Sequence, residues 1–321
     1  MGVEPVRLTL KYSIRDGEKV YYSLNEYLKK QFGCKVYKLS LNGGMTCPNR
    51  DGTCGTGGCI FCSSSGEFAE PQCENVTEQI ERAKQRVSAK IKSGKYIAYF
   101  QDHTNTYASP KYLEKLFTEA VNHPDIVALS VATRPDCLPD DVIGLLERLN
   151  KIKPVWVELG LQTIHKSTAE FIRRGYDLTV FDKAVKRLKA HGLTVVVHMI
   201  IGLPGETEQM IYDTASYIGR SGADGIKFHL LHVLKNTDLA DIFANGGFSL
   251  PTLEEYTSLL IGCLKRLPPK IVIHRLTGDG AKSELIAPLW SADKKRVLNY
   301  INNEFRRADL HQGELFVENS R

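Results

Sequence analysis

The sequence predicts an α/β fold, namely a partial (β/α)6-type TIM barrel with N- and C-terminal extensions. Apolar β-type runs alternate with helical patterns at a spacing of roughly 30 residues, which is typical of a parallel sheet with right-handed crossovers. Six or seven such units favour a barrel or a partial barrel. No proline-rich or low-complexity linker divides the chain, so we expect one main domain over residues 35–276, an extension at 1–34, and a helical extension at 277–321 that packs on the barrel.

The elements are expected in the following order. A charged helix is expected at 23–31, before the first strand. Strands are predicted at 36–41, 96–101, 126–132, 154–160, 193–201 and 225–231. Helices are predicted between them at 76–92, 110–122, 139–149, 164–172, 181–190 and 208–220. A helix at 253–267 is followed by one more apolar run at 270–276, and a basic helix lies near the C-terminus.

Composition excludes several classes of protein. Of the 321 residues, 42% are apolar and 25% are charged, which excludes a disordered, collagen-like or simple coiled-coil chain. No apolar run approaches the ~20 residues of a membrane helix, and residues 1–10 lack the apolar block of a signal peptide. We therefore expect a cytoplasmic protein without a membrane segment. The net charge of +5 permits an anionic partner such as RNA.

Cysteine spacing points to a metal or cluster site. Four of the eight cysteines, Cys47, Cys54, Cys59 and Cys62, fall within sixteen residues, with glycines between them that allow a tight fold. If all four bind, the site is an all-cysteine zinc site, although the gap of six residues before Cys54 is poor for one. If three bind, the site holds a four-iron cluster with one iron open to a ligand. The other cysteines are interpreted as small buried hydrophobes: Cys34, Cys73, Cys137 and Cys263.

Polar residues follow the predicted strands. In β/α barrels the working residues lie at the carboxyl ends of the strands. The cysteine loop follows the first strand, and the later strand ends carry Gln101, Arg134 with Asp136, Glu158 with Gln162, the turn Gly202-Leu-Pro204-Gly205-Glu206, and Lys227, His229 and His232. Each strand thus brings reactive groups to the same rim. A module that only binds zinc does not need such a set of residues.

Cluster, barrel and rim together resemble a radical S-adenosylmethionine (SAM) enzyme. The chain is most similar to the bacterial YhcC/YtqA-like branch, which is akin to the radical SAM domain of the elongator catalytic subunit. The matching strings include Cys-Pro-Asn-Arg-Asp-Gly and Gly-Gly-Cys-x-Phe-Cys in the cysteine loop, and they continue in order at 99–107, 132–140, 157–163, 201–207, 227–233 and 286–290.

The resemblance implies a [4Fe-4S] cluster held by Cys47, Cys59 and Cys62, with eleven and two residues between them. Cys54 falls where the branch needs no cysteine, and it is interpreted as a bystander. The open iron of such a cluster chelates SAM, and an electron from an external donor such as flavodoxin or ferredoxin breaks SAM into methionine and a 5′-deoxyadenosyl radical. The cofactors carry this step, while the protein positions them.

Cofactor-binding residues also follow from the resemblance. The turn formed by Gly202, Pro204, Gly205 and Glu206 matches the segment on which adenine rests, or it is a simple turn between a strand and a helix. Glu158 and Gln162 fit the ribose and the methionine end of SAM, or they form a polar core network. Gln101 stands where many relatives carry a Gly-Gly-Glu-like string for the SAM amino group.

The remaining rim residues are candidates for the substrate. Lys227, His229 and His232 would suit an anionic group, and Arg134 either binds a carboxylate or phosphate or pairs with Asp136. By resemblance the substrate is tRNA, at the C5 substituent of a wobble uridine, with the conversion of carboxymethylaminomethyl to aminomethyl as the example. Basic residues at 294–296 and 306–307 are candidates for RNA-backbone contact. The alternatives are a radical SAM enzyme acting on a small molecule or peptide, and a four-cysteine zinc module that binds nucleic acid.

Overall fold

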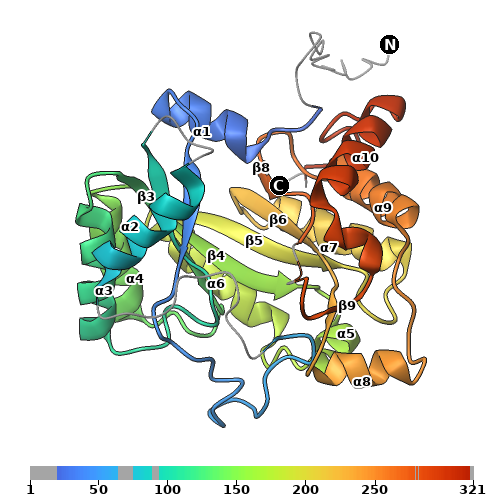
Figure 1. Ribbon diagram of the computed structural model, residues 1–321, viewed down its shortest axis with the longest axis horizontal. Coiled ribbons are helices and arrows are strands. Elements are labelled where there is room, and N and C mark those ends of the chain that lie inside the picture. Colours follow the sequence, from blue (N-terminus) through green and yellow to red (C-terminus); the bar gives the residue numbers. More distant parts are fainter. Residues whose placement is uncertain (1–19, 64–74, 89–93, 279, 281, 319–321) are drawn as a thin grey trace, which may run out of the picture.

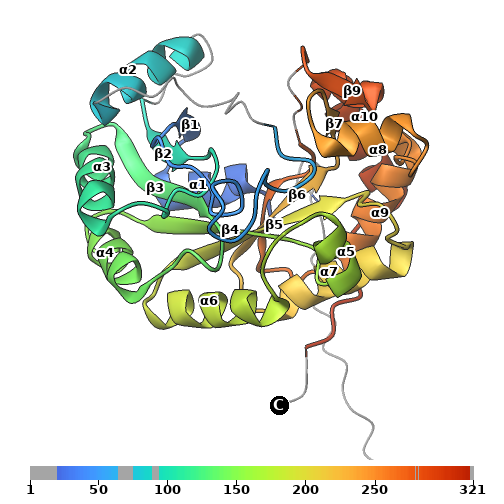
Figure 2. The ribbon, with the colours of Figure 1, turned by 90° about the horizontal axis from the view of Figure 1, so that it is seen from below.

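The fold is built on seven parallel strands. The computed structural model describes residues 20–63, 75–88, 94–278, 280 and 282–318. The strands pair in the order β1-β2-β3-β4-β5-β6-β8, all parallel. Their bounds are β1 Tyr37–Leu41, β2 Tyr96–Phe100, β3 Ile126–Thr133, β4 Val155–Gln162, β5 Thr194–Ile201, β6 Gly225–Leu230 and β8 Val272–Arg275. The sheet curls into a half-barrel (Figure 2), which confirms the predicted partial barrel.

Helices cover the convex side of the sheet, as Figure 2 shows for α2, α3, α4, α6, α7 and α9. The helices of the β/α units are α2 Val76–Val87, α3 Pro110–Asn122, α4 Asp140–Asn150, α5 Lys166–Phe171, α6 Leu178–Ala190, α7 Glu208–Arg220 and α9 Leu253–Lys265. Helix α1, Leu24–Phe32, precedes the sheet. The segment after β6 adds β7 Val233–Leu234 and α8 Asp238–Ala244, and the C-terminal part adds β9 Leu285–Ala287, the 3-10 helix η2 Leu289–Ala292 and α10 Lys294–Arg307.

Local sequence signals explain where the helices begin. Helix α3 starts after Ser109, whose side chain accepts a hydrogen bond from the backbone of Tyr112, and Pro110 occupies the first turn. Helix α9 starts with a capping box in which Thr252 and Glu255 bond to each other's backbone N–H. The apolar side of each helix packs on the sheet, and fully buried rings such as Phe117 and Phe181 fill the core between them.

The concave side of the sheet is polar. Successive side chains in a strand point to opposite faces, so every second residue faces the barrel interior. There the strands place Lys38, Tyr99, Ser130, Glu158, His198 and Lys227 close enough to bond to one another. Below this layer a small apolar floor that includes Trp156 packs on Leu28 of α1. Helix α1 and the loop that follows β1 lie at opposite ends of the sheet (Figure 1).

The structure differs from the expectation in a few elements. The apolar run at 270–276 is a seventh parallel strand, β8, which pairs with β6. The two-residue strand β7 pairs antiparallel with β9, about fifty residues away, and short partners this distant leave no periodic pattern. The expected helix at 76–92 is described as far as Val87, and residues 89–92, like Cys73 and residues 1–10, lie outside the described residues. None of the described helices has the length and apolarity of a membrane span.

Candidate functional site

The cysteine loop is a compact structure after β1. Backbone hydrogen bonds fold it on itself, with Arg50 N donating to Cys47 O at 2.8 Å and Cys62 N donating to Cys59 O at 3.0 Å. An isolated bridge joins Asp51 to Thr56 and forms a small protruding turn. Within that turn Gly52 has φ of 93°, a conformation that side chains other than glycine rarely adopt. Cys54 lies in the turn and is exposed.

Two other cysteines of the loop, Cys47 and Cys62, lie near the Cys59 thiol. Burial raises the pKa of the Cys59 thiol to about 11, and the nearby thiols of Cys62 and Cys47 raise it further, whereas Arg134 and Asn49 oppose the shift. Cys54 acts instead on the thiol of Cys137, whose pKa burial raises first and Cys54 raises further. A bound metal cluster would hold the Cys59 sulfur as the thiolate, because a coordinating thiol is deprotonated. The residues therefore fit a [4Fe-4S] cluster held by Cys47, Cys59 and Cys62.

The segment after β2 lies against the cysteine loop. Thr104 N donates to Thr46 O at 3.2 Å, and the hydroxyls of Tyr107 and Thr53 lie 2.8 Å apart. Gln101 is half-buried, and its Oε1 accepts a hydrogen bond of 3.4 Å from Ser40. Its neighbour Asp102 has a buried Oδ2 without a hydrogen-bond partner, and burial raises the pKa of that carboxyl. The sequence places Asp102 at the end of the second strand but gives it no role, although an unpartnered carboxylate oxygen is well suited to an ammonium group.

Glu158 lies at the centre of the barrel interior with 0% exposure. Its Oε1 accepts from Ser130 Oγ at 2.7 Å and from Lys38 Nζ, and its Oε2 accepts from Lys227 Nζ at 2.6 Å and from His198 Nε2 at 2.7 Å. Four elements of the barrel thus converge on one carboxylate. Burial acts to raise the pKa of Glu158, but Lys227 and Lys38 hold it well below its usual range. Of the two roles left open for Glu158, this is the arrangement of a polar core network.

Protonation in this network is set by burial. Lys227 is 6% exposed, and burial lowers its pKa to about 7, although Glu158 opposes the shift. Its ammonium also donates to Tyr99 Oη at 2.8 Å. Burial lowers the pKa of His198 to about 4, so this ring is neutral at pH 7. His229 is held neutral in the same way, by burial and then by Arg275, and its Nε2 is buried without a hydrogen-bond partner.

Arg134 is engaged on two sides. Its Nε and Nη2 donate to the carboxylate of Asp136 at 2.9 and 2.7 Å, and its Nη1 donates to the carbonyl of Arg174 at 2.8 Å. The guanidinium also lies over the ring of Tyr176, 5.1 Å from its centroid. Of the two roles that the sequence left open, the ion pair with Asp136 is the one present in this structure. Because Arg134 also acts on the Cys59 thiol, it lies beside the cluster ligands.

The ends of β4 and β5 form the remaining part of the rim. Gln162 has φ of 64°, and its amide lies so close to Gly160 that a Cβ there would meet Nε2 at 2.7 Å. In the turn after β5, Gly202 and Gly205 both have positive φ, and Pro204 is half-buried. Glu206 accepts from Thr163 Oγ1 through one oxygen, while its buried Oε2 has no partner. The turn thus carries an unpaired acceptor at the rim.

His232 connects the rim to the C-terminal part of the chain. Its Nε2 lies 3.2 Å from Ser291 Oγ of η2, and its ring packs closely on Gly278 and Gly280. The structure therefore packs His232 against residues of the predicted C-terminal extension.

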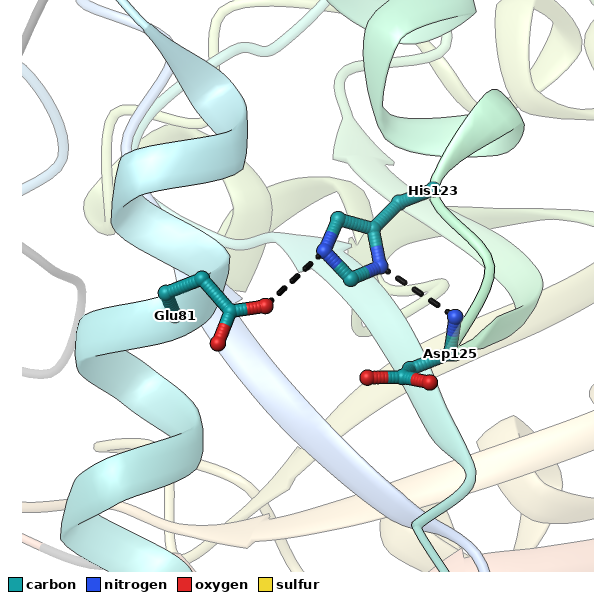
Figure 3. A group of neighbouring side chains, drawn as sticks. All are labelled: Glu81, His123 and Asp125. Atoms are coloured by element: carbon teal, nitrogen blue, oxygen red, sulfur yellow. Dashed lines mark hydrogen bonds and ion pairs between the residues drawn. The ribbon is translucent and has the colours of Figure 1, made fainter.

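Two other features lie at the opposite end of the barrel. Glu81, His123 and Asp125 form a cluster before β3 (Figure 3), with His123 Nε2 at 3.1 Å from Glu81. Lys84 Nζ already bridges the two carboxylates at 2.7 and 2.5 Å, so the cluster has its own cation. A cavity of about 650 Å³ lies beneath the apolar floor, where Trp156 and Tyr27 contribute to its lining. Among the described residues, neither the cluster nor the lining of the cavity includes a residue of the cysteine loop.

Comparison with known proteins agrees with this geometry. The sequence matches the Radical SAM superfamily over residues 50–218 and the Radical_SAM C-terminal domain over residues 223–307. It is 43% identical to the protein YtqA of Bacillus subtilis, over 93% of this chain and 94% of that protein. It is 38% identical to the protein YhcC of Escherichia coli, over 83% of this chain and 86% of that protein.

Among solved structures, the archaeal Elp3 of Methanocaldococcus infernus is similar in fold, with a TM-score of 0.66 and 17% identity over 86% of this chain and 64% of that chain. The family uses a [4Fe-4S] cluster and SAM, so the four-cysteine zinc alternative does not hold. The matched family, the relatives that extend over nearly the whole chain and the three converging cysteines lead to one conclusion. This chain belongs to the radical SAM superfamily, in the group of YhcC and YtqA.

Proposed function

We propose that this radical SAM enzyme modifies tRNA at the C5 substituent of a wobble uridine, converting a carboxymethylaminomethyl group to an aminomethyl group. Support comes from relatives whose names state an action on tRNA. The tRNA uridine(34) acetyltransferase of Methanocaldococcus jannaschii is 31% identical over 153 residues, which is 46% of this chain and 27% of that protein. That similarity is local, so it supports the substrate class and not the acetyl transfer.

The observation that carries the proposal is an excess of positive charge in the barrel interior. Lys38 and Lys227 share a single buried carboxylate, Glu158. Because two ammonium groups face one carboxylate, an anion that enters the barrel is bound more favourably than a neutral group would be. It would also keep Lys227 protonated, since an opposite charge raises the pKa of a lysine. The carboxylate of a carboxymethylaminomethyl group has this character, and the unpartnered His229 Nε2 adds a polar group above it.

The reaction balances with SAM as the net two-electron oxidant. When bound, the cluster supplies one electron to SAM, which yields methionine and the 5′-deoxyadenosyl radical. Hydrogen abstraction from the carbon beside the carboxylate gives 5′-deoxyadenosine and a carbon radical. Loss of one electron and one proton leaves an imine, and water hydrolyses it to the aminomethyl group and glyoxylate. The electron spent at the start is returned, so an external donor such as flavodoxin or ferredoxin serves only to prime the enzyme.

Nucleoside analysis tests the proposal. In tRNA from a deletion strain, mass spectrometry should show more carboxymethylaminomethyl uridine and less of the aminomethyl derivative. The reconstituted enzyme acting on that tRNA should form 5′-deoxyadenosine and glyoxylate in equal amounts, and the Cys59→Ala variant should form neither. Unchanged wobble uridines in the deletion strain would contradict the tRNA substrate while leaving the radical SAM chemistry intact. The substrate would then be a small molecule or a peptide.

A further inference from the structure

We propose that Asn49 is a positioning residue that tunes the reduction potential of the cluster through a hydrogen bond to the sulfur of Cys59. Asn49 lies two residues after the first cluster ligand, in the string Cys-Pro-Asn-Arg-Asp-Gly, and no role follows for it from the spacing of the cysteines. It is 4% exposed, which is unusual for an asparagine in a glycine-rich surface loop. A buried amide must find partners for both its N–H groups and its oxygen.

Both amide hydrogens of Asn49 have acceptors. Nδ2 donates to the carbonyl of Arg173 at 2.6 Å and to Cys59 Sγ at 3.6 Å, the second distance being longer because sulfur is a larger acceptor than oxygen. The Cys59 sulfur lies at the same distance, 3.6 Å, from that carbonyl. A single side chain therefore connects a cluster ligand to the turn that follows α5.

The surroundings of Asn49 leave it little freedom. A Cβ at Gly55 would meet Asn49 Oδ1 at 2.5 Å, and a Cβ at Gly175 would meet it at 3.1 Å. Two glycines from separate segments thus make room for this amide. Arg173, whose carbonyl receives the amide, has φ of 54°, a conformation unfavourable for a side chain other than glycine. The backbone at Gly55, Arg173 and Gly175 thus fixes the position of the amide, and with it the hydrogen bond to Cys59.

A hydrogen bond to a ligand sulfur has a defined electronic effect. It withdraws electron density from the thiolate, which stabilises the reduced and more negative form of the cluster and raises its potential. Reduction is the step that makes SAM cleavage possible, so a higher potential makes the cluster easier for the electron donor to reduce. Asn49 donates directly to the sulfur, whereas the N–H groups of Arg134 donate to Asp136 and to the carbonyl of Arg174.

Redox titration of the anaerobically reconstituted enzyme tests the inference, with the signal of the reduced cluster followed by electron paramagnetic resonance. Asn49→Ala should lower the midpoint potential, because the hydrogen bond to sulfur is lost. Asn49→Asp should lower it further, since it keeps the size of the side chain but places a negative charge beside the cluster. Should the alanine variant fail to fold, the near-isosteric aspartate variant carries the test.

Thr53→Val is the matched control. It removes a hydrogen bond of the same loop, between Thr53 and Tyr107, that does not reach a cluster sulfur. We expect its midpoint potential to equal that of the wild type. An unchanged potential in both Asn49 variants would overturn the inference, and so would a fall in Thr53→Val as large as that in Asn49→Ala.

Discussion

At the scale of single residues, Glu158 shows how a buried charge is kept. An ionised carboxylate inside a protein is unstable unless its oxygens receive hydrogen bonds and its charge is compensated. Glu158 receives four donors, two of them from lysines, so both conditions are met. Lys227 in turn depends on Glu158 to compensate its charge. The other hydrogen-bond partner that the structure identifies for Lys227 is the neutral hydroxyl of Tyr99.

Removing the carboxylate should therefore cost more than removing one of its partners. Glu158→Ala leaves Lys38 and Lys227 without their shared carboxylate, and breaking a buried pair in this way costs about 3–5 kcal/mol of unfolding free energy. Adding Lys227→Met to Glu158→Ala should recover part of that loss, since the uncompensated charge is then removed. Urea denaturation of the metal-free chain measures both. Equal stability of the wild type and Glu158→Ala would mean that the network has no structural role.

At the scale of elements, the four cysteines of the loop lie in two different environments. Cys47 and Cys62 lie near enough to Cys59 to affect its charge, while Cys54 lies in a turn that projects to the surface. A three-thiolate site leaves one iron open for SAM, which a four-thiolate site would not allow.

Alanine variants of the loop distinguish the two arrangements. Cys47→Ala, Cys59→Ala and Cys62→Ala should each reduce the iron content to the background of the metal-free chain, because two thiolates do not hold a site-differentiated cluster. Cys54→Ala should keep the brown chromophore, its full iron content and its yield of 5′-deoxyadenosine. Iron analysis and the visible spectrum after reconstitution check this. Loss of iron in Cys54→Ala would mean that the exposed sulfur is a ligand.

Long, periodic elements could be predicted from the sequence, and contacts between strands could not. Helices 110–122 and 208–220 have the bounds expected for them, because their caps and apolar stripes are local signals. Only part of the interior network could be predicted from the sequence. Alternation puts Lys38 on the face opposite Leu39, but its approach to Glu158 depends on the curl of the sheet and the register of four strands. Asn49 was missed for the same reason, since its partner Arg173 is remote in sequence.

At the scale of the whole molecule, the first turn of α10 presents positive charge where a helix does not favour it. Its apolar side, Val297, Ile301 and Phe305, is buried, and Lys295 and Arg296 lie exposed in its first turn. Cations are disfavoured at a helix N-terminus, because the helix dipole is positive there. Helix α10 follows directly after η2, which contacts the rim residue His232, so under the proposed function these basic residues are candidates for contact with tRNA.

Charge reversal in this turn should separate RNA binding from folding. Lys295→Glu with Arg296→Glu should leave the unfolding midpoint unchanged or raise it, because acidic residues favour a helix N-terminus. The affinity for tRNA should fall, and the plot of log affinity against log salt should become less steep, because each lost phosphate contact reduces the number of released counterions by about 0.7 to 0.9. Lys183→Glu with Lys186→Glu on α6 is the matched control, since these exposed lysines change the net charge equally on the convex side of the sheet. Filter binding at several salt concentrations measures both pairs, and an equal loss of slope in the two variants would show that net charge alone, and not the surface of α10, attracts the RNA.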